Sequence, residues 1–146
     1  MNIIKSIVFG RIERRWYLLK NNFIIKGIGL NTKNAIGKIH NIKHDPNPKE
    51  NTIIVTERLT YNLYMDLKKI NIKGIITDYG GLGSHIAIIA KQNKLPAVLG
   101  VYLQNNKKAT DILNSNDLVI LNSKDGIIKK LNQEELFKIL INNEPF

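Results

Sequence analysis

The residues with the clearest chemical potential form one short segment, Thr77-Asp78-Tyr79-Gly80-Gly81-Leu82-Gly83-Ser84-His85. Its three glycines allow tight turns and a close approach of the backbone to a ligand. Serine is a favoured N-cap, so a helix that begins after Ser84 would carry His85 in its first turn. The N–H groups and the dipole at a helix start attract anions and disfavour a charged imidazolium. A neutral imidazole there could attack phosphorus and hold the phosphoryl group.

Two other interpretations of the histidines remain beside this one. A glycine-rich loop between a strand and a helix can contain a histidine without any chemical role, and one such loop is a weak signal by itself. A metal site has less support. His40 and His44 are four residues apart in a proline-flanked segment that does not look helical, and no carboxylate cluster joins them. We therefore expect both to be exposed loop residues, and we expect no metal site.

The elements that must position this segment follow from the pattern of apolar residues. A β-branched run over residues 52–56 is typical of a buried strand. The pattern as a whole predicts strands over residues 52–56, 74–77, 97–101, 118–121 and 127–128, helices over residues 60–69, 84–93 and 132–142, and a proline-rich loop over residues 44–51. Strands alternate with helices in the middle third, which predicts βαβ units with a parallel sheet. The chain is thus expected to be one domain of the α/β or α+β class.

Composition narrows the function classes. The chain has 146 residues, enough for one domain with its own core, and 43% of them are hydrophobic. The absence of cysteine excludes disulfides and thiolate metal sites and favours a reducing compartment. No signal peptide or membrane span is recognisable, so we expect a cytoplasmic protein without membrane contact.

The net charge of +10 is unevenly distributed. Residues 1–50 hold ten basic and three acidic residues, a net of +7, whereas residues 51–146 hold twelve and nine, a net of +3. The excess therefore lies away from His85. Nucleic-acid binding is not favoured, because only 7% of the residues are aromatic and no nucleic-acid motif is present.

Residues 74–100 carry a longer pattern: Gly-Gly, a gap of two, Ser-His, a gap of one, Ala-Ile, and then Pro-Ala-Val and a glycine. This pattern resembles the signature of the phosphohistidine domain, also called the swivelling or mobile domain, of phosphoenolpyruvate-utilising enzymes. That family includes pyruvate phosphate dikinase, phosphoenolpyruvate synthase, enzyme I of the sugar phosphotransferase system, and rifampicin phosphotransferase. The resemblance extends over residues 23–131.

The resemblance implies a fold and a domain organisation. It implies an α/β fold, in the form of a single swivelling β/β/α domain over residues 23–131. Residues 1–22 then form a basic and aromatic N-terminal extension, and residues 132–146 form a C-terminal helix and tail. The extension contains Arg11, Arg14, Arg15, Trp16 and Tyr17. It could bind a partner or an acidic polymer, or it could be a solvated face with two aromatic residues folded onto the domain.

The resemblance also assigns the site residues. It implies that His85 is the phosphorylated histidine. The phosphate-facing loop would comprise Thr77, Asp78, Gly80, Gly81, Gly83 and Ser84. Two positions depart from the family. Gly83 stands where the dikinases and enzyme I often have threonine, and Lys91 stands where arginine is usual. The first change removes a hydroxyl near the phosphate, and the second keeps a charge without the bidentate fork of arginine.

In the family this domain is a shuttle. The resemblance implies a phosphocarrier between an ATP-grasp partner, which would bind ATP and Mg²⁺, and a TIM-barrel partner that binds pyruvate or phosphoenolpyruvate. No cofactor is expected on this chain, which lacks a Walker-type loop and is too short to be the complete phosphotransferase. We expect a stand-alone domain of the dikinase type, beside which an excised fragment of a larger enzyme and a remnant with another role stay open. The alternatives are a carrier for another acceptor, as in rifampicin phosphotransferase, and a non-catalytic binding module on the same fold.

Overall fold

A computed structural model describes residues 24–30, 33–80, 84–101 and 107–142. Its eight strands are β1 (Ile24–Lys26), β2 (Ile28–Gly29), β3 (Asn34–Asn41), β4 (Thr52–Thr56), β5 (Gly74–Thr77), β6 (Ala97–Leu99), β7 (Leu118–Asn122) and β8 (Ile127–Lys130). Its helices are α3 (Tyr61–Leu67), α4 (His85–Gln92), α5 (Ala109–Ile112) and α6 (Gln133–Asn142). The extension predicted over residues 1–22 lies outside the described residues.

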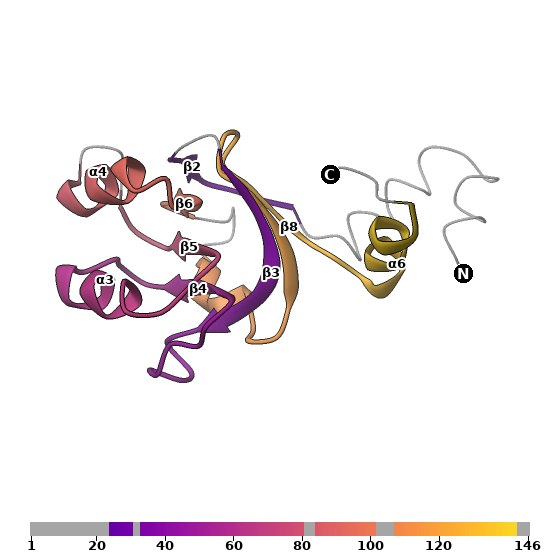
Figure 1. Ribbon diagram of the computed structural model, residues 1–146, viewed down its shortest axis with the longest axis horizontal. Coiled ribbons are helices and arrows are strands. Elements are labelled where there is room, and N and C mark those ends of the chain that lie inside the picture. The colour runs from indigo at the N-terminus through magenta and orange to yellow at the C-terminus, as the bar shows by residue number, and fades with distance from the viewer. Residues whose placement is uncertain (1–23, 31–32, 81–83, 102–106, 143–146) are drawn as a thin grey trace.

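The strands form one mixed sheet in the order β1-β8-β7-β3-β4-β5-β6-β2. Strands β3, β4, β5 and β6 run parallel to one another, and the other pairs are antiparallel. Helices α3 and α4 connect consecutive parallel strands and cover the same face of the sheet (Figure 1). The βαβ units and the parallel central strands predicted from the sequence are therefore confirmed.

The sheet curls until its two edges meet. Strands β1 and β2 lie at opposite ends of the strand order, yet only Gly27 separates them in the chain. The backbone N–H of Gly27 donates to the carbonyl of Gly126 at 2.8 Å, and a Cβ on Gly126 would lie 2.3 Å from the Gly27 oxygen. Gly126 also has a φ of +69°, which L-residues with side chains rarely adopt. Glycine at this corner thus permits the close backbone approach that closes the sheet.

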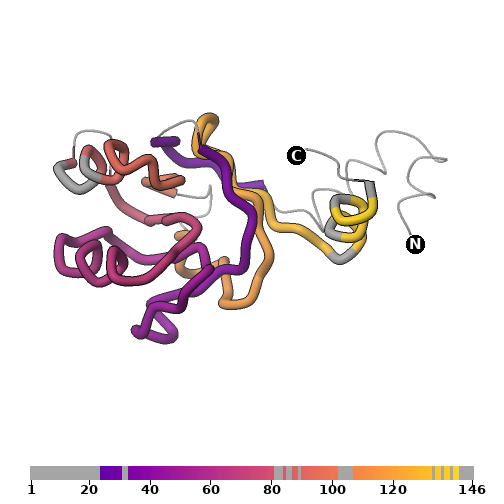
Figure 2. Tube along the Cα trace, in the orientation of Figure 1, coloured from indigo at the N-terminus to yellow at the C-terminus, as the bar shows by residue number. Residues whose placement is uncertain are grey.

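Two apolar clusters give the fold its β/β/α layers. One cluster is built mainly by the strands, with α5 beside them: Ile25, Ile39, Ile53, Val55, Ile76, Val98, Val101, Ala109, Leu113, Val119, Leu121 and Ile128. The other joins the parallel strands to α3 and α4: Leu30, Ile54, Leu67, Ile75, Ala87, Ala90, Ala97 and Leu99. Successive residues of β4 and β5 alternate between the two clusters, because neighbouring side chains of a strand point to opposite faces. Figure 2 follows the chain through this arrangement.

The expectation that both histidines near residue 40 are exposed is wrong for one of them. His40 lies in β3 and is only 2% exposed, and its Nε2 is 3.0 Å from the carbonyl oxygen of Asp45. The strand β3 continues to Asn41, so the pairing of β3 with β4 buries this imidazole before the loop begins. His44 is exposed in the turn, as expected.

The C-terminal helix also differs from the expected packing. The sequence suggests an apolar face with Leu136, Ile139 and Leu140 that packs on the domain. In α6, however, Leu140 is 71% exposed and Phe137 is 65% exposed. The side chains of Leu136 and Ile139 lie outside what the structure describes. Figure 1 places α6 on the side of the sheet opposite to α3 and α4, away from the apolar cluster that those two helices form with the parallel strands.

Candidate functional site

The candidate site lies where two parallel strands end. Thr56 of β4 is paired with Thr77 of β5, so the segments that follow these strands leave the sheet at the same edge. Thr77 is fully buried, and its hydroxyl donates to the carbonyl of Tyr79 at 2.7 Å. This bond turns the chain sharply after β5. Gly80 then adopts a φ of +126°, a conformation that glycine tolerates best.

Ser84 defines the start of the helix that follows. Its hydroxyl oxygen accepts a hydrogen bond from the N–H of Ala87 at 3.1 Å, and its carbonyl accepts from the N–H of Ile88 at 3.1 Å. Ser84 is thus the N-cap of α4 and His85 is the first helical residue, as the sequence predicts. Any α-helix leaves its first N–H groups without acceptors of its own, so this end can bind an anion. Gly81 and Gly83 of the predicted loop lie outside the described residues.

Asp78 has a partner that the sequence did not reveal. This fully buried carboxylate accepts hydrogen bonds from the N–H of Thr110 at 3.0 Å and from the hydroxyl of Thr110 at 2.6 Å. Thr110 is the second residue of α5, so Asp78 links the end of β5 to the start of this short helix.

A second carboxylate, that of Asp111, accepts a hydrogen bond from the backbone N–H of Lys108 at 3.2 Å. This bond, together with a weaker contribution from Lys43, lowers the pKa of Asp111 below its usual value.

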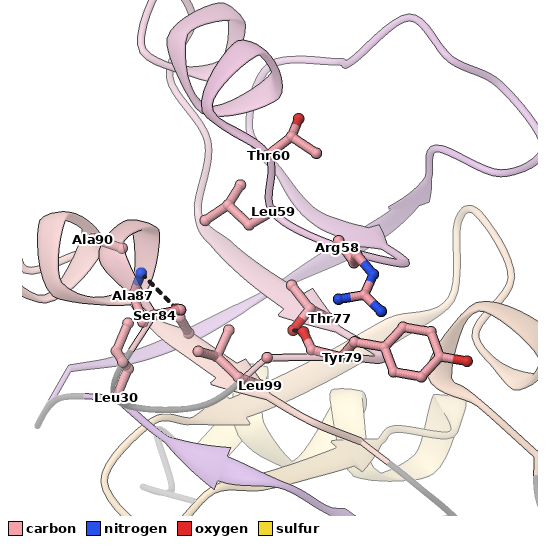
Figure 3. A pocket seen from close by; sticks show the side chains of 12 residues that line it. Leu30, Arg58, Leu59, Thr60, Thr77, Tyr79, Ser84, Ala87, Ala90 and Leu99 are labelled. Carbon is pink, nitrogen blue, oxygen red and sulfur yellow. Dashed lines mark hydrogen bonds between the residues drawn. The ribbon is translucent and has the colours of Figure 1, made fainter.

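A cavity of about 220 Å³ opens between the strand ends and the starts of α3 and α4. Its walls include Leu30, Leu59, Ala87, Ala90, Ala97 and Leu99, and its polar lining residues include Arg58, Thr60, Thr77 and Ser84. Figure 3 shows Arg58 and Thr60 on the β4–α3 side and Ser84 at the start of α4. The predicted loop residues Thr77, Gly80 and Ser84 therefore share one cavity, and the sequence reasoning missed that Arg58 joins them.

A signal for Arg58 was present in the sequence. It stands two residues after the strand that ends at Thr56, as Tyr79 stands two residues after Thr77. Parallel neighbouring strands bring such positions together. The guanidinium carbon of Arg58 indeed lies 4.6 Å from the centroid of the Tyr79 ring, and the Nζ atom of Lys108 lies 4.9 Å from the same centroid. Both distances are typical of cation–π contacts.

Two further properties of the described part of the chain concern ligands and membranes. No three histidine or acidic side chains there are grouped so that they could hold a metal ion. Nor does any helix of the described ranges have both the length and the apolar character needed to cross a membrane.

The N-cap of α4 can be tested by its effect on stability. Replacing Ser84 with alanine leaves the Ala87 N–H without its side-chain acceptor and should lower the free energy of unfolding by about 1 kcal/mol. Asparagine at position 84 can restore the acceptor and should recover most of this loss. Urea unfolding followed by circular dichroism measures both variants. Equal destabilisation by alanine and asparagine would show that Ser84 does not act as a cap.

Comparison with known protein families shows to which family the chain belongs. The family model described as "PEP-utilising enzyme, mobile domain" matches residues 48–126, more than half of the chain. The match includes β4, β5, α4 and the loop between the last two.

Curated relatives agree with the family model. The phosphoenolpyruvate-protein phosphotransferase of Mycoplasma capricolum subsp. capricolum is 34% identical over 85 residues, which are 58% of this chain and 14% of that protein. The probable phosphoenolpyruvate synthase of Archaeoglobus fulgidus is 30% identical over 112 residues, which are 75% of this chain and 14% of that protein. The chain thus spans 14% of the length of each of these relatives.

The fold is also present in the crystal structure of Thermococcus kodakaraensis aconitase X in its holo form. The two chains superpose with a TM-score of 0.57 at 18% identity, over 75% of this chain and 98% of that one. This likeness concerns the fold alone, and one fold can serve different activities. The assignment therefore depends on the sequence match, which covers the segment from β4 through the glycine-rich loop to β7. This chain belongs to the mobile-domain family of the phosphoenolpyruvate-utilising enzymes.

Proposed function

We propose that the chain is a phosphohistidine carrier that moves a phosphoryl group between an ATP-binding partner and a partner that binds pyruvate or phosphoenolpyruvate. The observation that carries this proposal is the position of His85, directly after the N-cap Ser84 and at the first residue of α4. The names of the relatives support the same chemistry, since one is a phosphoenolpyruvate-protein phosphotransferase and the other a probable phosphoenolpyruvate synthase.

The proposed step is an exchange of bonds at phosphorus. A lone pair on an imidazole nitrogen of His85 attacks the phosphorus of phosphoenolpyruvate and forms a P–N bond. The bond between phosphorus and the enol oxygen breaks, and its electron pair stays on that oxygen, so that pyruvate forms after protonation. The ring proton on the other nitrogen is then lost. In the opposite direction, the phosphohistidine returns the group to the oxygen of an acceptor.

The place of residue 85 at the first position of α4 fits this step. The dipole at the start of α4 disfavours a charged imidazolium and therefore favours the nucleophilic form of the ring. The same dipole and the N–H groups of the first turn attract the negative charge that the ring acquires with the phosphoryl group. ATP and Mg²⁺ belong, in this proposal, to the ATP-binding partner, and the chain itself supplies the nucleophile and the anion-binding helix end.

A labelling experiment with the full chain tests the proposal. The chain is incubated with labelled phosphoenolpyruvate, or with ATP labelled at the β and γ positions, alone and with candidate ATP-grasp and TIM-barrel proteins. We expect a covalent label that is stable in base and labile in acid, and that peptide mass spectrometry assigns to residue 85. No covalent label with any combination, or a label at the exposed His44 instead, would overturn the proposal.

A further inference from the structure

The cavity between the strand ends and the starts of α3 and α4 is lined by both apolar and polar residues. Its volume of about 220 Å³ is several times larger than the roughly 30 Å³ that one water molecule occupies in the liquid. It can therefore admit a tetrahedral phosphoryl group together with a few waters. Besides Thr77 and Tyr79 at the end of β5, polar residues from two further segments line it, namely Arg58 and Thr60 between β4 and α3, and Ser84 before α4 (Figure 3).

Arg58 is the one charged residue among those that line this cavity in the described part of the chain. Its guanidinium lies against the Tyr79 ring, which orients the side chain without using its N–H donors in a salt bridge. No carboxylate of the described residues lies within ion-pair distance of it. The planar group therefore offers N–H donors that match the oxygens of a phosphoryl group, to which arginine can bind in bidentate fashion.

The hydroxyl groups of Thr60 and Ser84, which also line the cavity, can donate hydrogen bonds to a ligand. The Thr60 oxygen accepts from the N–H of Leu63 at 3.2 Å, and the Ser84 oxygen accepts from the N–H of Ala87 at 3.1 Å. Because each oxygen acts as an acceptor in its own cap, the O–H of each side chain can be directed toward a ligand. None of the described residues that line the cavity is acidic, and the buried carboxylate of Asp78, the residue after Thr77, is held by Thr110. The cavity is thus suited to an anion.

We infer that Arg58 binds the phosphoryl group carried by His85, and that the cavity between Arg58 and Ser84 is the pocket that receives this group. The inference rests on the proposed function, since it requires a phosphorylated His85. Arg58 and Lys108 both contact the Tyr79 ring, but only Arg58 lines the cavity. The inference therefore assigns phosphoryl binding to Arg58 and not to Lys108.

The test uses the full chain and a chemical phosphoryl donor, so that no partner protein is needed. Phosphoramidate transfers its phosphoryl group to an imidazole nitrogen, with formation of a P–N bond and release of ammonia. The ³¹P signal that is missing in the His85→Ala variant belongs to residue 85. A pH titration of that signal then gives the midpoint at which the phosphoryl group changes from monoanion to dianion.

A nearby guanidinium stabilises the dianion, so its removal should make the second proton harder to lose. We expect Arg58→Gln to move the titration midpoint upward by roughly 0.5 to 1 pH unit, and Arg58→Lys to move it much less. Lys68→Gln is the matched control, because Lys68 lies over the ring of Tyr64, with its Nζ atom 5.8 Å from the centroid, and lines a different cavity. This control should leave the midpoint unchanged.

The outcomes separate the two proposals. A wild-type chain that takes up no phosphoryl group at residue 85 would overturn both the carrier function and the role of Arg58. A normal signal at residue 85 whose midpoint is the same in wild type and Arg58→Gln would overturn the role of Arg58 alone. An equal shift in Arg58→Gln and Lys68→Gln would also overturn it, because the effect would then reflect net charge rather than contact.

Discussion

Replacement of His85 by alanine is expected to abolish covalent phosphorylation of the chain. The imidazole provides the lone pair that forms the P–N bond, and none of the described side chains that line the cavity is a comparable nucleophile. Removal of a nucleophile lowers transfer by a factor on the order of 10³ or more, which brings the label to background. The measurement is the amount of acid-labile, base-stable phosphate per chain after incubation with phosphoenolpyruvate and the active partner proteins.

The controls for this prediction come from the chain itself. His44→Ala removes an exposed histidine from the turn after β3 and should leave the label unchanged. Ser84→Ala should retain a measurable rate, because it weakens the helix cap but keeps the nucleophile. Persistence of the full label in His85→Ala, or its loss in His44→Ala, would contradict the assignment of His85.

Much of the fold could be predicted because its central elements are locally encoded. The strand over residues 52–56 and the strand over residues 74–77 appear with the predicted bounds, since each is a short apolar run that is buried along most or all of its length. The helix start at Ser84 could be predicted for a similar reason, because an N-cap depends on the residues of one turn.

The missed features depend on residues distant in sequence. Strands β1 and β2 are short and are stabilised by pairing with β8 and β6, about 70 to 100 residues away along the chain. The four residues of α5 are too few for a stable isolated helix. The start of this helix is held by Asp78, which accepts a hydrogen bond from the N–H of Thr110, the second helical residue. His40 is buried in the part of β3 that pairs with β4, where it lies opposite Ile54, and no local pattern indicates this pairing.

The candidate site likewise combines locally encoded residues with residues that are brought together by distant parts of the chain. The glycine-rich segment and Ser84-His85 could be identified from order and spacing alone. The signal for Arg58, its place two residues after the strand over residues 52–56, is weaker, because it brings Arg58 beside Tyr79 only through the parallel register that pairs Thr56 with Thr77. The partner of Asp78 was hidden for the same reason, since Thr110 lies 32 residues further along the chain.

Asp78→Ala is expected to produce the largest loss of stability among the variants considered. The carboxylate is fully buried and accepts two hydrogen bonds from Thr110, one from the backbone N–H and one from the hydroxyl. Alanine leaves both donors buried without an acceptor, and each unsatisfied donor costs about 1 to 3 kcal/mol. We therefore expect the free energy of unfolding to fall by roughly 3 kcal/mol, measured by urea denaturation.

Asparagine at position 78 should be much milder, and this difference tests the mechanism. Its amide oxygen can still accept from the Thr110 N–H, and the Thr110 hydroxyl can accept from its amide nitrogen. The cost should be about 1 kcal/mol, which reflects the exchange of charge-assisted bonds for neutral ones. Asp125→Ala removes a carboxylate from an exposed turn, where it accepts from the Asn122 side chain at 3.1 Å, and should change stability by less than about 0.5 kcal/mol.

A double-mutant cycle locates the effect in the Asp78–Thr110 pair. Thr110→Val removes the hydroxyl and leaves one carboxylate oxygen without its partner, whereas the combined variant Asp78→Ala with Thr110→Val leaves only the backbone N–H unsatisfied. The combined loss should therefore be smaller than the sum of the single losses, by roughly 1 to 2 kcal/mol. Additive losses would show that the pair does not act as a unit. An Asp78→Ala protein as stable as Asp125→Ala would mean that the end of β5 is held in place without this link to α5.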